Sequence, residues 1–169
     1  MRLAAIYNIH GNLPALEAVL REIRELKVDQ VVVGGDIVPG PMPRETLSCL
    51  LDIDAAVKFI YGNGEVAVLE EMAGRKPSVP PQYLPIISWT AQQLQPEDHK
   101  LLAAWSNRVT VQIHGLGHVL FCHATPRNEN EIFTRLTPEN RLLPVFAGVN
   151  AQNSVTPSSA WFSLADKAR

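Results

Sequence analysis

Five polar residues of the types that bind metal ions each follow an apolar segment of this sequence. They are Asn8, His10, Asp36, Asn63 and His123. Taken singly, each of these residue types is common in turns or as a satisfied polar group. Together they offer a carboxylate, imidazoles and amide oxygens, a mixture that suits divalent ions such as Mn²⁺, Fe²⁺ or Zn²⁺. Five such residues at successive segment ends indicate one shared site.

The chemistry of such a site depends on how many ions it holds. A carboxylate such as Asp36 can bridge two ions. Two ions about 3.5–4 Å apart can stabilise both the attacking and the leaving oxygen of an in-line displacement at phosphorus. A two-ion site with these ligands therefore predicts hydrolysis of a phosphate ester.

A strand, a helix and a second strand at the start of the chain explain how the first ligands would meet. Residues 3–6 form an apolar strand, residues 13–26 carry apolar side chains at helical spacing, and residues 30–33 are a β-branched run typical of a strand buried on both faces. A right-handed βαβ unit brings Asp36 beside the first two ligands at the carboxyl edge of a parallel sheet. In open α/β sheets this edge is where ligands bind.

Later segments deliver the remaining two residues to the same edge. Residues 56–61 predict a third strand that ends at Gly62-Asn63-Gly64-Glu65, and residues 119–122 predict a buried strand that ends at His123. A further strand is predicted at 109–114, and helices at 44–51, 66–72, 86–94 and 97–105. Another helix is predicted to start with Thr137 as its N-cap and to run to about 145 or 146. Residues 150–169 show no clear period and are left unassigned.

The bulk composition predicts one soluble domain. The chain has 169 residues, 46% of them hydrophobic and 19% charged, which is typical of a single globular domain. The net charge of −2 provides no basic face for nucleic acid, and no polybasic patch, signal peptide or membrane-spanning run is evident, so we expect a cytoplasmic protein. Cys49 and Cys122 are expected as buried free thiols rather than as a disulfide.

Four motifs in a fixed order resemble those of the calcineurin-like metallophosphoesterases. They are Asn8-Ile9-His10-Gly11-Asn12, Gly35-Asp36, Gly62-Asn63-Gly64-Glu65 and Cys122-His123-Ala124-Thr125-Pro126, within residues 1 to about 149. The sequence is similar to the small bacterial branch that includes the YfcE-type phosphodiesterases. The resemblance implies an α/β fold arranged as an αββα sandwich, and hydrolysis of phosphate mono- or diesters by a two-metal hydroxide mechanism.

The resemblance also implies a role for each candidate residue. Asn8 and His10 would hold one ion, Asp36 would bridge the two, and Asn63 and His123 would hold the other. Among them, Asp36, Asn63 and His123 would be the catalytic residues. The implied cofactors are two divalent ions drawn from Mn, Fe, Zn or Ni. The implied substrate is a phosphate-ester small molecule or a phosphoprotein.

Three departures from the family pattern predict a weakened site. Asn8 stands where the family has Asp, which replaces a charged ligand with a neutral amide. Gly64 stands where many members have His, and the family's final Gly-His-x-His motif has no counterpart after His123. We therefore expect weak metal binding and impaired hydrolysis. With the family's C-terminal strands missing, we interpret residues 1–149 as a metallophosphoesterase-like domain and residues 150–169 as a divergent tail.

Two other interpretations stay open at this point. The chain is either a non-catalytic binding or regulatory protein that keeps the phosphoesterase fold, or a truncated product stabilised by association. An incomplete sheet would leave open strand edges, and we expect a homo-oligomer to cover them.

Overall fold

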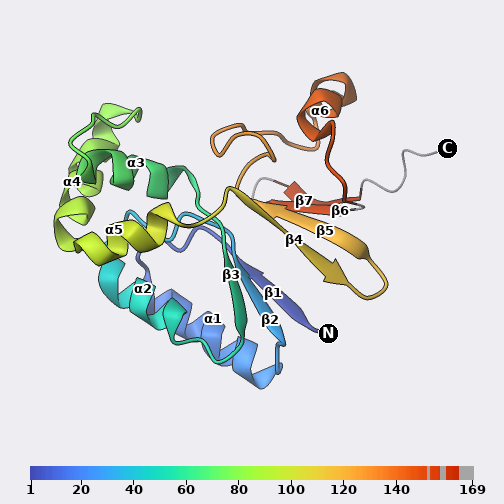
Figure 1. Cartoon of the computed structure of the whole chain (residues 1–169), viewed down its shortest axis with the longest axis horizontal. Helices are drawn as coiled ribbons and strands as arrows, with labels where there is room; N and C mark the ends of the chain where they lie inside the picture. Colours follow the sequence, from blue (N-terminus) through green and yellow to red (C-terminus); the bar gives the residue numbers. More distant parts are fainter. Residues whose placement is uncertain (152, 157–158, 164–169) are drawn as a thin grey trace.

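The computed structural model describes residues 1–151, 153–156 and 159–163, except for the side chains of residues 156 and 159–163. Its elements in chain order are β1 (Leu3–Ile6), α1 (Leu13–Glu25), β2 (Gln30–Val33), α2 (Pro43–Leu51), β3 (Ala56–Phe59), α3 (Asn63–Met72), the 3-10 turn η1 (Pro81–Tyr83), α4 (Leu84–Gln93), α5 (Pro96–Ala103), β4 (Arg108–Ile113), β5 (Gly117–Cys122), α6 (Glu139–Phe146), β6 (Asn153–Thr156) and β7 (Ser159–Ser163). Figure 1 shows two separate sheets with most of the helices on one side. None of the helices within the described residues is long and apolar enough to cross a membrane.

The first sheet is parallel, with the strand order β1-β2-β3. Its register pairs Ala4 with Val31 and Val31 with Val57. The central strand is fully buried at Val31, Val32 and Val33, as expected for β-branched residues covered on both faces of a parallel sheet. The predicted βαβ unit is therefore confirmed, and the carboxyl ends of β1, β2 and β3 lie at one edge.

The second sheet has the strand order β4-β5-β6-β7. β4 and β5 form an antiparallel hairpin, β6 runs parallel to β5, and β7 returns antiparallel to β6. Residues 153–156, which show no sequence pattern, form β6 by pairing with β5, and Ser154 there is fully buried. This strand depends on a partner distant in sequence, which local periodicity does not report.

The two sheets pack face to face and enclose a small apolar core. Its buried members come from both sheets and the segment after β3: Val32, Ile60, Val111, Val119 and Phe121. A larger core lies between the first sheet and helices α1–α5, whereas α6 lies on the outer side of the second sheet (Figure 1). This layer order of helix, sheet, sheet and helix agrees with the predicted α/β sandwich.

The helices α2, α4 and α5 begin one or two residues before the predicted position. The starts of α3 and α6 also differ from the prediction, each because of a specific contact. α3 starts at Asn63 rather than at Val66, because Gly62 is extended and its N–H is bound by a side chain from the first turn of the helix. α6 starts at Glu139, and the Thr137 hydroxyl accepts a hydrogen bond from the Thr134 N–H (2.9 Å) instead of capping the helix. The earlier start of α3 places Asn63 inside a helix.

Both cysteines are free thiols, as predicted. Cys122 is fully buried, and burial raises the pKa of its thiol to about 12, so it is unreactive near neutral pH. Cys49 is only partly buried, which corrects the prediction for that residue. Cys49 lies on α2 and lines a surface hollow.

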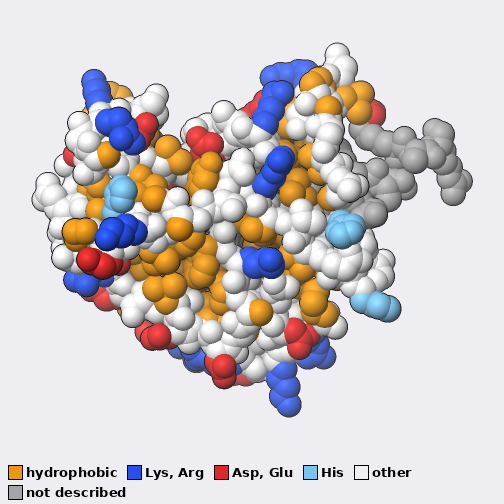
Figure 2. All heavy atoms as spheres, viewed as in Figure 1, with side chains coloured by type: hydrophobic (Ala, Val, Ile, Leu, Met, Phe, Trp, Pro, Cys, Tyr) orange, Lys and Arg blue, Asp and Glu red, His pale blue; other side chains and the backbone are white. Residues whose placement is uncertain are grey.

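The surface carries an apolar region beside an edge of the first sheet. Figure 2 shows apolar side chains gathered between α5 and β3, where the rings of Phe59 and Trp105 stack with their centroids 4.8 Å apart. In the described part of the chain, β1 and β3 are the outer strands of the first sheet. Their coverage by a homo-oligomer stays a prediction.

Candidate metal centre

The loops that follow β1 and β2 run side by side and carry the first candidate ligands. The Asn8 N–H donates to the Gly35 carbonyl (3.1 Å), and the His10 N–H donates to the Asp36 carbonyl (2.9 Å). Asn8, His10 and Asp36 have φ angles of 53°, 49° and 55°. Such left-handed backbone is uncommon outside glycine, is adopted most readily by Asn, Asp and His, and clusters at functional sites. Asn, His and Asp at these three positions are therefore residue types that can bind a metal and can also adopt the left-handed backbone found there.

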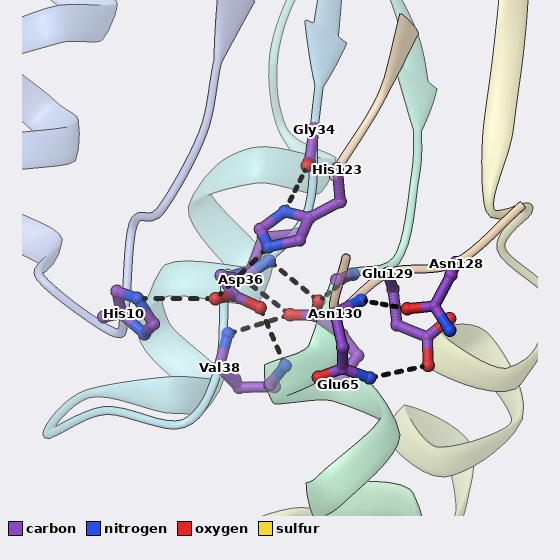
Figure 3. A network of polar contacts seen from close by, with 12 residues as sticks. His10, Gly34, Asp36, Val38, Glu65, His123, Asn128, Glu129 and Asn130 are labelled. Atoms are coloured by element: carbon purple, nitrogen blue, oxygen red, sulfur yellow. Dashed lines mark hydrogen bonds and ion pairs between the residues drawn. The ribbon is translucent and has the colours of Figure 1, made fainter. Parts of the chain in front are cut away.

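Asp36 lies between two imidazoles that come from different sheets. Its Oδ2 atom is 3.6 Å from His10 Nε2 and 3.5 Å from His123 Nε2. Figure 3 shows the two rings on different sides of the carboxylate. The His123 side chain is 7% exposed and the His10 side chain 50% exposed, so the centre is closed on the β5 side and open on the β1 side.

The tautomer of His123 follows from its second contact. His123 Nδ1 lies 2.9 Å from the Gly34 carbonyl oxygen, which only accepts hydrogen bonds, so Nδ1 carries a proton. Nε2 then faces the Asp36 carboxylate, and a proton or a metal cation must lie between the two atoms to make the contact favourable. Burial lowers the pKa of His123, but the hydrogen bond and charge of Asp36 outweigh it and raise this pKa above its ordinary value.

The pKa of Asp36 moves in the opposite direction. Burial raises it, but the hydrogen bond and charge of His123 and the hydrogen bond from the Gly64 N–H (2.7 Å to Oδ1) lower it below its ordinary value. A lowered carboxyl pKa and a raised imidazole pKa both favour the ion pair. In the metal-free centre the ion pair is therefore formed when both nitrogens of the His123 ring carry a proton.

This ion pair predicts a pH dependence of stability in the metal-free protein. The raised pKa of His123 stabilises the fold below the unfolded value of about 6.5, and this contribution is lost as the pH rises through the folded pKa. The lowered pKa of Asp36 stabilises the fold above the unfolded value of about 3.9, and this contribution is lost as the pH falls through the folded pKa. Both contributions are complete only between about pH 4 and 6.5.

Urea unfolding in the presence of a chelator checks this expectation. The free energy of unfolding of the wild type is expected to fall between pH 6 and pH 8.5 by more than that of the Asp36→Asn variant, in which the pair is absent. An identical pH dependence in the two proteins would show that the pair contributes no stability.

Glu65 binds the backbone of the loop that carries Asp36, and it was not among the predicted site residues. It is fully buried in the first turn of α3, and its carboxylate accepts four backbone N–H groups. Oε1 binds the amides of Ile37 (2.7 Å) and Val38 (3.0 Å), and Oε2 binds those of Asp36 (2.8 Å) and Gly62 (2.7 Å). The signal in the sequence was its position three residues after Gly62, where an acidic side chain caps a helix N-terminus.

Opposing effects act on the ionisation of Glu65. Burial and the charge of Asp36 raise the pKa of Glu65 above its ordinary value, and the hydrogen bonds from the amides of Val38, Gly62 and Asp36 offset only part of this rise. Each of the four donors needs its own lone pair, and a protonated carboxyl has only three to offer. The full set of contacts is therefore complete only for the ionised form.

Glycines allow the close backbone approach beneath the centre. A Cβ atom on Gly62 would lie 2.4 Å from Asp36 Oδ1, and one on Gly64 would lie 2.2 Å from the Val38 carbonyl oxygen. Gly35 has a φ of 92°, and a Cβ there would lie 2.9 Å from His123 Nδ1. No side chain fits at these positions without moving the loop that carries Asp36.

The two predicted amide ligands, Asn8 and Asn63, take no part in the ion pair. Asn8 is exposed and lines a surface hollow between β1 and α1, together with Ile6, Asn12 and Val19. Asn63 is half-buried as the first residue of α3. In the described part of the chain, no hydrogen bond joins either side chain to Asp36. The contacts around Asp36 bring together His10, Asp36 and His123, and the roles of Asn8 and Asn63 as ligands stay predictions.

The three clustered residues fit divalent ions as pairs rather than as one closed set. Within the described residues, no three His, Cys, Asp or Glu side chains converge on one point as a ready-made metal site. Each imidazole nevertheless lies 3.5–3.6 Å from the same Asp36 oxygen. This matches the separation of about 3.4 Å between two ligands of one tetrahedral ion. His10, Asp36 and His123 are thus the clustered residues that would hold divalent ions here.

Fold and site together define a class of protein. Two sheets packed face to face, with imidazole and carboxylate side chains at the carboxyl ends of their strands, are features of α/β proteins that bind divalent metals at a sheet edge. The chain belongs to the calcineurin-like phosphoesterase family, whose pattern it matches over residues 1–160.

Similar proteins support the assignment to this family. The chain is 32% identical over 139 residues to an uncharacterized protein of Methanocaldococcus jannaschii. The aligned residues make up 81% of this chain and 54% of that protein. The chain therefore spans about half the length of this relative. A metallophosphoesterase from Sphaerobacter thermophilus superposes with a TM-score of 0.65 at 29% identity, covering 92% of this chain and 59% of the other.

A second solved structure shares the fold. A hypothetical protein from Pyrococcus horikoshii OT3 superposes with a TM-score of 0.75 at 22% identity, covering 91% of this chain and 68% of the other. At this identity the likeness concerns the fold alone. The narrower resemblance to the YfcE-type branch stays a prediction.

Proposed function

We propose that this chain hydrolyses phosphate mono- or diesters with two divalent ions held by His10, Asp36, Asn63 and His123, and that Asn8 weakens the site. The observation that carries the proposal is the single Asp36 oxygen flanked by two imidazoles from different sheets. When bound, the ions would supply the positive charge that activates water and stabilises the leaving oxygen. The proposed substrate is a phosphate-ester small molecule or a phosphoprotein.

The residues on the two sides of Asp36 have different roles in the proposed site. The contact with the Gly34 carbonyl fixes the His123 ring so that Nε2 faces Asp36, and the Gly64 N–H fixes the second oxygen of that carboxylate. His10 is half exposed, which leaves its side of the centre accessible to a phosphate group from solvent. The closed side would therefore orient the ligands and the open side would receive the substrate.

Replacement of Asn8 by Asp tests the proposed weakness. The Asn8→Asp variant is expected to bind Mn²⁺ about tenfold more tightly than the wild type, because a carboxylate adds the charge that an amide lacks. Hydrolysis of bis(4-nitrophenyl) phosphate is expected to rise in parallel. Isothermal titration calorimetry and release of 4-nitrophenol measure the two quantities.

A matched control lies four residues further along the chain. Asn12 lines the same hollow and caps α1 through a bond to the Ala15 N–H (3.2 Å), a role that Asp fills equally well. Asn12→Asp should therefore leave Mn²⁺ affinity and hydrolysis within about twofold of the wild type, well below a carboxylate's effect as a ligand. Equal effects of the two substitutions would mean that Asn8 acts through general charge and not as a ligand.

The alternative function is that of a non-catalytic binding protein. The observation in its favour is that the described residues contain no closed set of three acidic, cysteine or histidine ligands. If Asn8→Asp showed neither metal binding nor hydrolysis, this alternative would replace the proposed enzyme activity. Wild-type hydrolysis at the rate of the Asn8→Asp variant would instead contradict the proposed impairment.

A further inference from the structure

Three of the four N–H groups that Glu65 binds belong to consecutive residues, Asp36, Ile37 and Val38. Successive amides that point to one side of the backbone form a concave anion-binding nest. Here the anion is a side chain of the protein itself, delivered by α3 from the neighbouring strand unit. The loop that carries Asp36 is thus folded around the Glu65 carboxylate.

The fourth N–H group extends the same contact to the next loop. Gly62 lies in the loop after β3. Its N–H donates to the same Glu65 oxygen, Oε2, as the N–H of Asp36. One carboxylate oxygen therefore ties together the loops after β2 and β3. Between these two loops the Gly64 N–H reaches Asp36 Oδ1.

The nest also accounts for the backbone of Asp36. This residue has a φ of 55°, which a non-glycine residue adopts only when its surroundings impose it. The Asp36 N–H and the Ile37 N–H belong to the peptide groups before and after Asp36. Because both donate to Glu65, the backbone is held on both sides of Asp36. A small rotation there would swing the Asp36 carboxylate away from His10 and His123.

We propose that Glu65 is a positioning residue of the metal centre, whose carboxylate fixes the loop of Asp36 and so sets the Asp36 oxygen between the two imidazoles. The inference rests on the proposed function for its metal readout. It assigns Glu65 no contact with substrate or ion. Its effect is exerted through the backbone amides of Asp36–Val38 and Gly62.

The test uses Glu65→Asp and a matched core variant. Glu65→Asp keeps the negative charge and both oxygens but shortens the side chain by one methylene, so the carboxylate cannot reach all four amides. Val68→Ala lies on the same helix, is fully buried in the core between the first sheet and the helices, and removes none of the hydrogen bonds that hold the loop. Both variants lose stability, and only Glu65→Asp changes the carboxylate that the four amides bind.

Two readouts separate positioning from stability. Glu65→Asp is expected to weaken Mn²⁺ binding at least about tenfold, the range found when residues that orient metal ligands are changed, while Val68→Ala stays within about twofold. In the metal-free proteins, the ¹⁵N chemical shifts of the His123 ring report its contact with Asp36. They are expected to change in Glu65→Asp and to remain at wild-type values in Val68→Ala.

Each result decides the inference. Equal behaviour of the two variants in both readouts would overturn it. If the wild type binds no Mn²⁺, the proposed function fails, and the His123 shifts still decide whether Glu65 positions Asp36. If Glu65→Asp does not fold, hydrogen exchange of the wild type provides the test. The amides of residues 36–38 and 62 are then expected to be as protected as those of β2. Rapid exchange of these amides would overturn the inference.

Discussion

Glu65→Gln is expected to lower the free energy of unfolding by about 3 kcal/mol, because a glutamine keeps one acceptor oxygen and turns an amide NH₂ group toward two backbone donors. Two buried N–H groups then lose their partners, at about 1–3 kcal/mol each, and relief of the buried charge offsets part of this loss. The affected amides are either those of Ile37 and Val38 or those of Asp36 and Gly62. Urea unfolding followed by circular dichroism measures the change.

Glu71→Gln provides the control for this substitution. Glu71 lies on the same helix and is only partly buried, so its replacement should change the free energy of unfolding by no more than about 0.5 kcal/mol. A loss below about 1 kcal/mol in Glu65→Gln would mean that the four contacts contribute no more than a single ordinary hydrogen bond.

Gly64→Ala is expected to lower the free energy of unfolding by about 2–3 kcal/mol through overpacking. The added Cβ would lie 2.2 Å from the Val38 carbonyl oxygen and 2.9 Å from Asp36 Oδ1, so the backbone must move. Because the Gly64 N–H donates to that same Asp36 oxygen, Mn²⁺ affinity should fall together with stability. Unfolding and metal titration of the same preparation measure both.

Gly115→Ala separates crowding from backbone strain. Gly115 has a φ of 83° and nothing within 4 Å of the added Cβ, so only strain of about 1–2 kcal/mol applies, and Mn²⁺ affinity should not change. Wild-type metal affinity in Gly64→Ala would show that the loop adapts without displacing Asp36. A histidine in place of Gly64 would meet the same collision as an alanine. Gly64→His is therefore expected to disturb Asp36 rather than to add a functional group.

The sequence pattern predicted the centre of the site because parallel strands end at a common edge. His10 and Asp36 follow adjacent strands of one βαβ unit, so their proximity depends only on that local topology. His123 was predicted from its place after a buried strand. It reaches Asp36 because the two sheets pack face to face with Val32 and Phe121 between them.

The parts that sequence reasoning missed depend on tertiary contacts. An acidic residue in the first turn of a helix is normally read as an exposed capping group, and nothing in the sequence says that Glu65 is buried beneath a neighbouring loop. Asn8 follows the same strand as His10, yet its side chain lines the hollow beside α1. β6 likewise owes its strand conformation to β5 rather than to its own pattern.

Titration of chelator-treated protein with Mn²⁺ tests the central claim that Asp36 is the shared ligand of a metal centre. The wild type is expected to bind Mn²⁺, and Asp36→Asn is expected to lose at least about a hundredfold in affinity, because the one oxygen that faces both imidazoles loses its charge. Asp54→Asn, on the exposed turn before β3, should bind as the wild type does. Wild-type affinity in Asp36→Asn would contradict the account.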